Sequence, residues 1–255
     1  MKTMSSYESF AALYDRLMTD VDYDGWCDFM EDSFARMKVQ PKLVLELGCG
    51  TGNLTVRLAK RGYSMIGLDN SPEMLQIATE KSEGLDILYL LQDMTEFELY
   101  GTVDAVVCSL DCLNYLTEEG MLEDCFSLVS LYLNPNGVFL FDMNTQYKME
   151  HILAPETFLY DDGTIFYTWQ SIWEEEYQEC EYDLTFFVKE GELYRRFEET
   201  HFQRAYSLEE VEQALKKAGL ELIEVCDGFD RKPVCETTDR FFFTAKKTGD
   251  FYSEL

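Results

Sequence analysis

Basic residues are scarce in this sequence. Only 21 lysines and arginines accompany 49 aspartates and glutamates among 255 residues, so the formal net charge is −28 at pH 7. A surface this negative repels phosphate backbones and anionic lipid head groups over at least a Debye length. We therefore expect no nucleic acid and no membrane among its partners, and the acidity is otherwise interpreted as serving solubility.

Long apolar runs are also missing. No segment approaches the roughly 18 residues that a membrane helix requires. The first twenty residues, MKTMSSYESFAALYDRLMTD, are interrupted by acids and hydroxyls and do not resemble a signal peptide. These features predict a soluble, cytoplasmic protein.

Metal-binding and disulfide patterns are absent as well. The eight cysteines are scattered without a CxxC pair, and the two histidines, His151 and His201, lie far apart. This spacing indicates neither a zinc site nor a disulfide framework. We expect buried, reduced thiols and no bound metal.

Strand and helix patterns alternate over the first 144 residues. Apolar runs predict strands at residues 42–47, 63–68, 85–91, 103–109 and 138–142, and helices at residues 53–60, 71–81 and 117–132. A helix at residues 207–219 and strands at 220–226 and 241–246 follow later. Because parallel connections need right-handed crossovers, this order predicts an α/β, doubly wound, mostly parallel sheet with helices on both faces. Ligands of such sheets bind at the carboxyl ends of the strands.

Residues 145–206 have a different pattern. Aromatic-rich, partly alternating segments occur at residues 164–173, 177–188 and 193–206, with turn signals at Asp162-Gly163 and Glu190-Gly191. We expect consecutive antiparallel strands here, inserted into the main sheet's sequence.

A glycine-rich loop follows the first predicted strand. Gly48, Gly50 and Gly52 let the chain turn tightly and bring a ligand against bare backbone. In the dinucleotide fingerprint the third glycine comes three residues after the second, where this chain has Asn53. Glu46 would also repel a pyrophosphate. A ligand that carries an ammonium and a sulfonium fits this loop better.

The segment Glu46-Leu47-Gly48-Cys49-Gly50-Thr51-Gly52 resembles the [DE]-x-G-x-G-x-G motif of class I S-adenosylmethionine-dependent methyltransferases. The resemblance covers residues 43–142 and implies a Rossmann-like, seven-stranded fold with S-adenosyl-L-methionine as cofactor. It also implies that Asp69 holds both ribose hydroxyls, since a carboxylate offers acceptors to a vicinal diol. The other implied cofactor contacts are Gly48, Cys49, Gly50, Gly52 and Asn53 in the loop, Asn70, Ser71, Met74, Gln92, Asp93 and Met94 around adenine, and Ser109, Leu110 and Asp111 along the methionine part.

Two further segments resemble parts of this family. Residues 7–26 are similar to the N-terminal helix and loop that cover the cofactor in a bacterial small-molecule subgroup, with Tyr14 and Tyr23 as contacts or, alternatively, as packing aromatics. The insertion is similar to the antiparallel lid of glycine and amino-sugar N-methyltransferases. The resemblance implies a core of residues 1–144 and 207–255, with residues 1–35 as cover, and a lid of residues 145–206 over the acceptor site.

Acceptor chemistry suggests a short set of catalytic candidates. An amine must lose its proton and a hydroxyl needs a base, for which Asp111, Tyr115 and His201 are candidates. Asp111 has a positioning role as its alternative, and His201 a packing role. Asn114 and Tyr115 are predicted to line the acceptor pocket. The arginines Arg195, Arg196 and Arg204 can bind a substrate carboxylate or pair with neighbouring glutamates; Arg195 and Arg204 are the predicted substrate contacts.

Taken together, these patterns predict an enzyme that transfers a methyl group from S-adenosylmethionine to N or O of a small-molecule acceptor. The alternative is a non-catalytic S-adenosylmethionine-binding sensor or regulatory protein, because a fold does not prove its activity. The glycine spacing disfavours a nicotinamide-dependent oxidoreductase, and the charge disfavours a nucleic acid methyltransferase. The acceptor's identity and the oligomeric state are left open.

Overall fold

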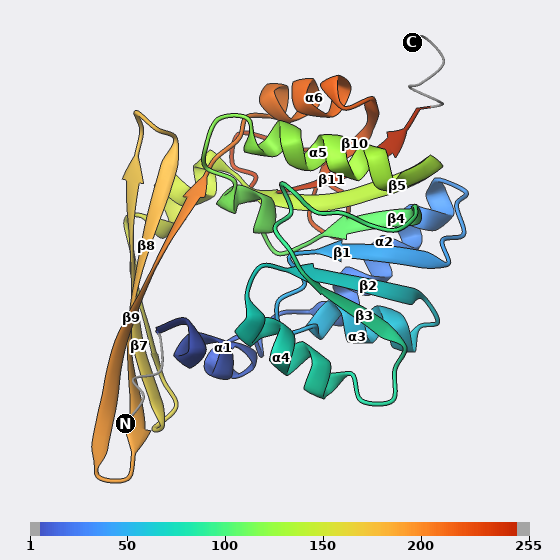
Figure 1. Cartoon of the computed structure of the whole chain (residues 1–255). Helices are drawn as coiled ribbons and strands as arrows, with labels where there is room; N and C mark the ends of the chain where they lie inside the picture. Colours follow the sequence, from blue (N-terminus) through green and yellow to red (C-terminus); the bar gives the residue numbers. More distant parts are fainter. Residues whose placement is uncertain (1–5, 249–255) are drawn as a thin grey trace.

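Residues 6–248 are described by a computed structural model that contains two β-sheets (Figure 1). The larger has seven strands in the order β10-β11-β5-β4-β1-β2-β3. They are β1 (Leu43–Leu47), β2 (Ser64–Asp69), β3 (Ile87–Leu91), β4 (Val103–Cys108), β5 (Leu133–Asn144), β10 (Leu220–Asp227) and β11 (Arg240–Lys247). Strands β1 to β5 pair in parallel, and β11 runs antiparallel to both its neighbours. The predicted doubly wound, mostly parallel sheet is confirmed.

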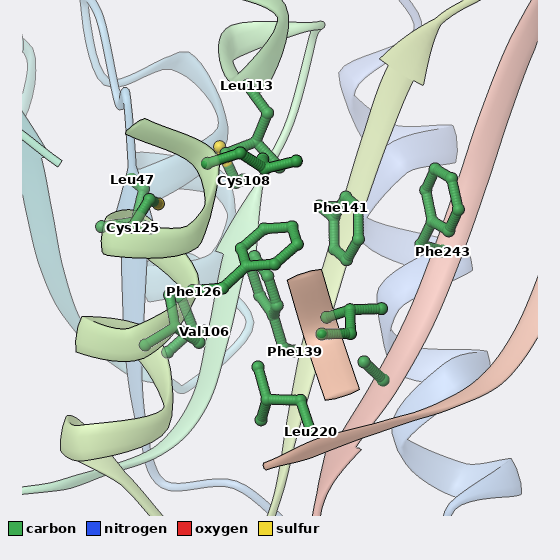
Figure 2. Packing of buried hydrophobic residues seen from close by; sticks show 14 of the residues in the cluster. Leu47, Val106, Cys108, Leu113, Cys125, Phe126, Phe139, Phe141, Leu220 and Phe243 are labelled. Atoms are coloured by element: carbon green, nitrogen blue, oxygen red, sulfur yellow. The ribbon is translucent and has the colours of Figure 1, made fainter. Parts of the chain in front are cut away.

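Helices cover both faces of this sheet, which explains the continuous apolar runs of its strands. One face packs against α5 (Met121–Tyr132) and α6 (Leu208–Lys217), and the other against α2 (Tyr23–Arg36) and α3 (Asn53–Lys60). Phe126 of α5 lies against Phe139 and Phe141 of β5, with ring centroids 5.5 and 5.4 Å apart (Figure 2). The Phe141 ring stacks in turn on Phe243 of β11, 4.6 Å away. This aromatic layer fixes β5 and β11 side by side.

Local capping signals set several helix boundaries where the sequence predicts them. The Ser71 hydroxyl accepts a hydrogen bond from the Met74 N–H at 3.2 Å, and Pro72 opens α4 (Pro72–Lys81). Ser207 and Glu210 form the predicted capping box of α6.

The predicted starts of α5 and β5 are wrong by four or more residues. The helix predicted from residue 117 begins at Met121, because residues 118–120 form a bend and a turn in which Gly120 has φ +90°. The 3₁₀ helix η1 (Cys112–Tyr115) lies before this turn. Strand β5 begins at Leu133, not at residue 138, with a register shift opposite β4. The segment LNPNG is therefore part of an irregular strand.

The second sheet is antiparallel, with the order β6-β7-β8-β9. Its strands are β6 (Thr157–Asp161), β7 (Ile165–Glu174), β8 (Glu179–Glu190) and β9 (Leu193–Arg204). Three of them were predicted, whereas β6 and the π-helix η2 (Lys148–Leu153) were not. Asp162 fixes the β6–β7 turn by accepting hydrogen bonds from the Thr164 and Ile165 N–H groups at 2.8 and 2.7 Å.

Helix α1 (Ser6–Leu17) joins the two sheets. It packs against both α4 and β9 and lies between the second sheet and the glycine loop's side of the core (Figure 1). Leu13 packs with Ile165 of β7 and Phe186 of β8. The ends of the predicted core, residues 1–5 and 249–255, lie outside the described residues.

The cysteines are unpaired, as the sequence predicts, but not all are buried. Cys112 is partly exposed and Cys235 is exposed, because Cys235 lies in the loop between β10 and β11. Within residues 6–248, no helix combines the length and apolarity needed to cross a bilayer.

Candidate active site

Three glycines with left-handed backbones follow β1. The φ angles are +65° at Gly48, +52° at Gly50 and +74° at Gly52, a region that favours glycine. A side-chain carbon would approach the Cys112 sulfur to 2.7 Å if placed at Gly48, and the Tyr89 hydroxyl to 2.7 Å if placed at Gly52. At Gly50 it would meet nothing within 4 Å. Packing therefore requires two of the glycines, whereas Gly50 leaves bare backbone facing open space, as a bound nucleoside needs.

Asp69 ends β2 beside this glycine. Its two carboxylate oxygens accept hydrogen bonds from the backbone N–H of Gly50 at 2.8 Å and of Ser71 at 2.9 Å. Burial raises the pKa of Asp69, and these backbone hydrogen bonds only partly oppose that shift. Each oxygen keeps a second lone pair, so the carboxylate can accept two ribose hydroxyls while the loop holds it. The residues present fit the predicted cofactor; the ribose contact itself stays a prediction.

The loop after β3 positions Asp93. Its Oδ1 accepts hydrogen bonds from the N–H and hydroxyl of Thr95 at 2.8 and 2.7 Å, and its Oδ2 accepts one from Asn70 at 3.4 Å. Burial opposes ionisation, yet these hydrogen bonds lower the pKa of Asp93. The Gln92 side chain is bonded at both ends to the backbone of Glu98, so in this structure it closes the loop.

Cys49 and Met94 lie close to the glycine loop. The Cys49 N–H donates to the Leu68 carbonyl at 2.9 Å, and its side chain is buried. The Met94 methyl carbon stands 3.5 Å from the position that a side-chain carbon at Gly48 would take. Both residues lie near enough to the glycine loop to contact a cofactor bound there. Their contacts with the cofactor stay predictions.

Glu46 is a buried carboxyl behind the loop. It accepts a hydrogen bond from the hydroxyl of Thr55 in α3. Burial raises the pKa of Glu46 to about 8; the Thr55 bond opposes this shift and the nearby Asp69 charge adds to it. Its predicted attraction for a cationic ligand stays a prediction.

Helix α1 is tied to the glycine loop by a residue that the sequence reasoning missed, Asp15. Its Oδ1 accepts hydrogen bonds from the Thr51 hydroxyl at 2.6 Å and the Asn53 amide at 2.9 Å, and its Oδ2 pairs with Lys81 at 2.7 Å. Asp15 directly follows the predicted Tyr14, but no local pattern marks its partners. Asn53, predicted as a cofactor contact, also donates to the Tyr23 hydroxyl at 3.1 Å.

The two predicted tyrosines face the same region. Burial raises the pKa of Tyr14 well above its ordinary value, and the neighbouring Tyr23, Cys112 and Asp111 side chains raise it further. Tyr23 is 7% exposed and carries Arg57 over its ring, 4.9 Å from the centroid.

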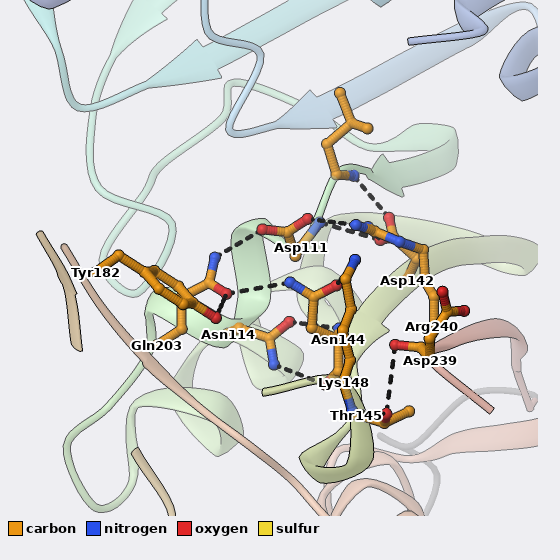
Figure 3. Close-up of polar contacts among 11 residues, drawn as sticks. Asp111, Asn114, Asp142, Asn144, Thr145, Lys148, Tyr182, Gln203, Asp239 and Arg240 are labelled. Atoms are coloured by element: carbon orange, nitrogen blue, oxygen red, sulfur yellow. Dashed lines mark hydrogen bonds and ion pairs between the residues drawn. The ribbon is translucent and has the colours of Figure 1, made fainter. Parts of the chain in front are cut away.

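Next to the loop after β4, an arginine of β11 lies between two carboxylates, one from this loop and one from β5 (Figure 3). Arg240, at the start of β11, pairs with Asp111 at 2.7 Å and also with Asp142. Burial alone would lower the pKa of Arg240, but the charges of Asp142 and Asp111 outweigh it and the pKa is raised. Asp142 also accepts hydrogen bonds from the Leu110 and Asp111 N–H groups at 2.7 and 3.0 Å.

These bonds hold an unusual backbone. Leu110 and Asp111 have φ of +61° and +55°, a region that costs non-glycine residues about 1–2 kcal/mol each. Strain of this kind persists where surrounding contacts fix it, and it is frequent at functional sites. Sequence spacing could not reveal Arg240, because it lies 129 positions from Asp111.

Gln203 of β9 connects the second sheet to this loop (Figure 3). Its amide donates to Asp111 Oδ2 at 2.6 Å, and its carbonyl oxygen accepts from Asn144 at 3.2 Å and from the Tyr182 hydroxyl at 3.1 Å. Lys148 of η2 donates to Asn144 at 2.9 Å. Gln203 was not predicted; its only sequence signal is a place on the same strand face as His201.

The other catalytic candidates lie nearby. The Tyr115 and His201 rings meet edge to face at 5.9 Å, and Phe10 of α1 lies 5.6 Å from His201 on another side. Burial lowers the pKa of His201, which keeps the imidazole neutral. His201 Nε2 and the Ser109 hydroxyl are buried and have no hydrogen-bond partner within the described part of the chain.

The predicted substrate contacts are placed differently. Asn114 is fully buried, donates to the Asn144 and Arg204 carbonyls and accepts from the Asn144 N–H, so its amide holds backbone together. Arg195 pairs with Glu190 at 2.9 Å, and Arg204 with Glu210 at 2.7 Å. Both arginines therefore pair with neighbouring glutamates, which is the alternative to binding a substrate carboxylate. The substrate roles of all three stay predictions.

Known proteins resemble this chain over nearly its full length. The family described as methyltransferase domain matches residues 44–137. A Geobacillus sp. protein named as a methyltransferase is 39% identical over 246 residues, covering 95% of this chain and 100% of the relative. Bacillus subtilis YqeM, also named as a methyltransferase, is 38% identical over 249 residues, covering 97% and 99%.

Solved structures give the same fold. An S-adenosylmethionine-dependent methyltransferase from Clostridium acetobutylicum has a TM-score of 0.86 and 36% identity, covering 95% of this chain and 99% of that one. The sugar N-methyltransferase KedS8 from Streptoalloteichus has a TM-score of 0.78 and 18% identity, covering 93% and 92%, which relates it by fold alone.

The seven-stranded sheet with its glycine loop and strand-end carboxylates defines a Rossmann-like methyltransferase. The chain belongs to the S-adenosylmethionine-dependent methyltransferases, and its cofactor is S-adenosylmethionine.

Proposed function

We propose that this enzyme transfers a methyl group from S-adenosylmethionine to N or O of a small molecule held between the core and the second sheet, which acts as a lid. The observation that carries the proposal is the 2.6 Å hydrogen bond from Gln203 of β9 to Asp111 at the end of β4. It puts the inner face of the second sheet next to the edge where ligands of such sheets bind. The net charge of −28 argues against a nucleic acid acceptor.

The cofactor supplies a methyl carbon activated by its sulfonium. The chain's residues then have to align the acceptor and exclude water. Asp111 is engaged at both oxygens by Gln203 and Arg240, which favours a positioning role over proton transfer. Neutral His201, with an unbonded Nε2, is the better candidate to accept a proton from the acceptor.

Cofactor binding and turnover are tested separately. Titration calorimetry with S-adenosylhomocysteine measures the site, and Asp69→Ala should weaken binding by about 1.5–3 kcal/mol because charge-assisted hydrogen bonds are lost. Asp86→Ala removes an exposed carboxylate before β3 and should bind as the wild type does. Equal affinity in Asp69→Ala would remove the ribose assignment.

Turnover is measured with methyl-labelled S-adenosylmethionine and a bacterial metabolite extract. Label in a small-molecule product is the expected result. Tight cofactor binding with no labelled product would favour the sensor alternative, and label found only in macromolecules would contradict the proposal.

A further inference from the structure

The second sheet presents one face to the rest of the molecule. Its strand register aligns His201, Tyr182 and Ser171 in one row and Glu199, Leu184 and Trp169 in the next. Side chains two positions apart on a strand share a face, so both rows lie on the face that carries Gln203. We call Trp169, Ser171, Glu199 and His201 the polar belt.

Apolar contacts flank the polar belt on both sides. Toward η2, Met149 and Leu153 pack with Cys180. Toward the other end, Leu13 of α1 packs with Phe186. Leu184, inside the belt's rows, is partly buried against both groups. The polar belt therefore has an apolar cluster at each of its two ends.

Each residue of the polar belt carries a buried polar atom without a partner. Within the described residues, no hydrogen bond reaches Trp169 Nε1, Ser171 Oγ, Glu199 Oε1 or His201 Nε2. Glu199 and Ser171 are each 7% exposed. A buried polar group without a partner is costly, and such groups are rare in native proteins. Four of them in two adjacent rows indicate a surface built to meet a ligand's polar atoms.

Glu199 determines the charge that this surface prefers. Burial raises its pKa, and no positive group contributes to the shift. The nearest arginine on the same strand face, Arg195, is paired with Glu190. The Trp169 and Tyr182 rings lie 5.6 Å apart within the two rows, and aromatic rings also favour a cation. An ammonium supplies the missing charge, whereas an anionic acceptor would be repelled.

The polar belt also leads to the reacting edge. Gln203, His201 and Glu199 alternate along β9, with Gln203 bonded to Asp111 and His201 in contact with Tyr115. Figure 3 shows Gln203 bonded to Asp111, with Tyr182 beside Gln203. A molecule anchored at Glu199 therefore extends toward the end of β4.

We propose that the polar belt binds the methyl acceptor and that the acceptor carries an amine whose ammonium pairs with Glu199. This inference rests on the proposed function, and it adds the acceptor's chemical class and the residue that selects it.

The test compares two probes of similar shape and different charge, cyclohexylamine and cyclohexanol, in saturating S-adenosylhomocysteine. Tryptophan fluorescence reports binding, because two of the three tryptophans, Trp169 and Trp173, lie on the belt's face. Wild type should bind the amine about tenfold more tightly than the alcohol, and Glu199→Gln should lose most of that preference. Glu198→Gln, which removes an exposed partner of Arg196 on the opposite face, should keep it.

Two results would overturn the inference: no preference for the amine in wild type, or an unchanged preference in Glu199→Gln. Folding of this variant is checked by its melting temperature, which should equal or exceed that of wild type because an uncompensated buried carboxylate is removed. Calorimetry with S-adenosylhomocysteine alone separates the two hypotheses. If that ligand binds and the amine preference is missing, only this inference fails; if it does not bind, the proposed function fails.

Discussion

At the carboxyl edge of the large sheet, each buried acid has partners within the chain. Asp69 accepts from two backbone N–H groups, Asp142 pairs with Arg240, and Glu46 accepts from Thr55. On the inner face of the second sheet, Glu199 is nearly as buried as Glu46, yet its Oε1 has no partner in the described chain. The two regions meet at the Gln203–Asp111 hydrogen bond, which is 2.6 Å long.

This difference separates two kinds of binding surface. Carboxylates held by backbone hydrogen bonds keep their geometry before a ligand arrives, which suits a constant cofactor. A face with unpaired polar atoms gains its hydrogen bonds only from a ligand, so it rejects molecules that lack the matching groups. Under the proposed function, the edge that binds the cofactor is preorganised and the second sheet selects the acceptor.

The largest expected effect is at the preorganised edge. Gly50→Val places a branched side chain where a Cβ now meets open space, on a backbone with φ +52°. S-adenosylhomocysteine should give no measurable heat of binding, because the side chain would occupy the place predicted for the nucleoside, while circular dichroism should show a retained fold.

Gly84→Val is the matched control for this variant. Gly84 also has a left-handed backbone, φ +84°, and open space around it, but it lies between α4 and β3. The Gly84→Val variant should have a similar backbone strain and should bind S-adenosylhomocysteine as tightly as the wild type does. Full affinity in Gly50→Val would mean that the glycine loop does not touch the cofactor.

The next largest effect is expected where the two regions meet. Arg240→Met removes the guanidinium that pairs with both Asp111 and Asp142, which should reduce the free energy of unfolding by about 3–5 kcal/mol. Urea denaturation measures it. Arg196→Met, which breaks only an exposed pair with Glu198, should cost about 0–1 kcal/mol. Equal losses in both variants would contradict the role assigned to Arg240.

The smallest expected effect, counted per pH unit, is a change in the free energy of unfolding at the two buried glutamates, Glu46 and Glu199. The folded-state pKa of Glu46, about 8, lies above its ordinary value of 4.5, so the folded protein holds this proton where the unfolded chain releases it. The stability from this group is fully present below pH 4.5 and is lost as pH rises through 8. Glu46→Gln should therefore gain on wild type by up to about 1.4 kcal/mol per pH unit across that window.

The same comparison applies to Glu199, whose pKa is also raised by burial. Urea denaturation from pH 5 to pH 8 should show the same sign for Glu199→Gln. A gain in Glu46→Gln that does not change with pH would show that Glu46 is ionised throughout.

Most of the fold could be predicted from short stretches of sequence. Apolar runs gave the strands, and the caps at Ser71 and Ser207 gave helix starts. The errors have local causes too. Helix α5 begins later than predicted because it follows the turn at Gly120. Strand β6 was missed because it is only five residues long, Thr157–Asp161. In the site, the glycine loop and Asp69 were predictable because they end successive strands, whereas Asp15 was not, since its partner Thr51 lies 36 positions away.

The sequence alone determined most of the strands and helices, the turn at Gly50 and the acids at the ends of β1 and β2, because these depend on residues within a few positions of one another. Only the tertiary structure decided that Arg240 lies between Asp111 and Asp142, and that Glu199 Oε1 is buried without a hydrogen-bond partner among residues 6–248. Those facts depend on chain segments that meet across the fold, and their energies come from burial, which no local pattern contains.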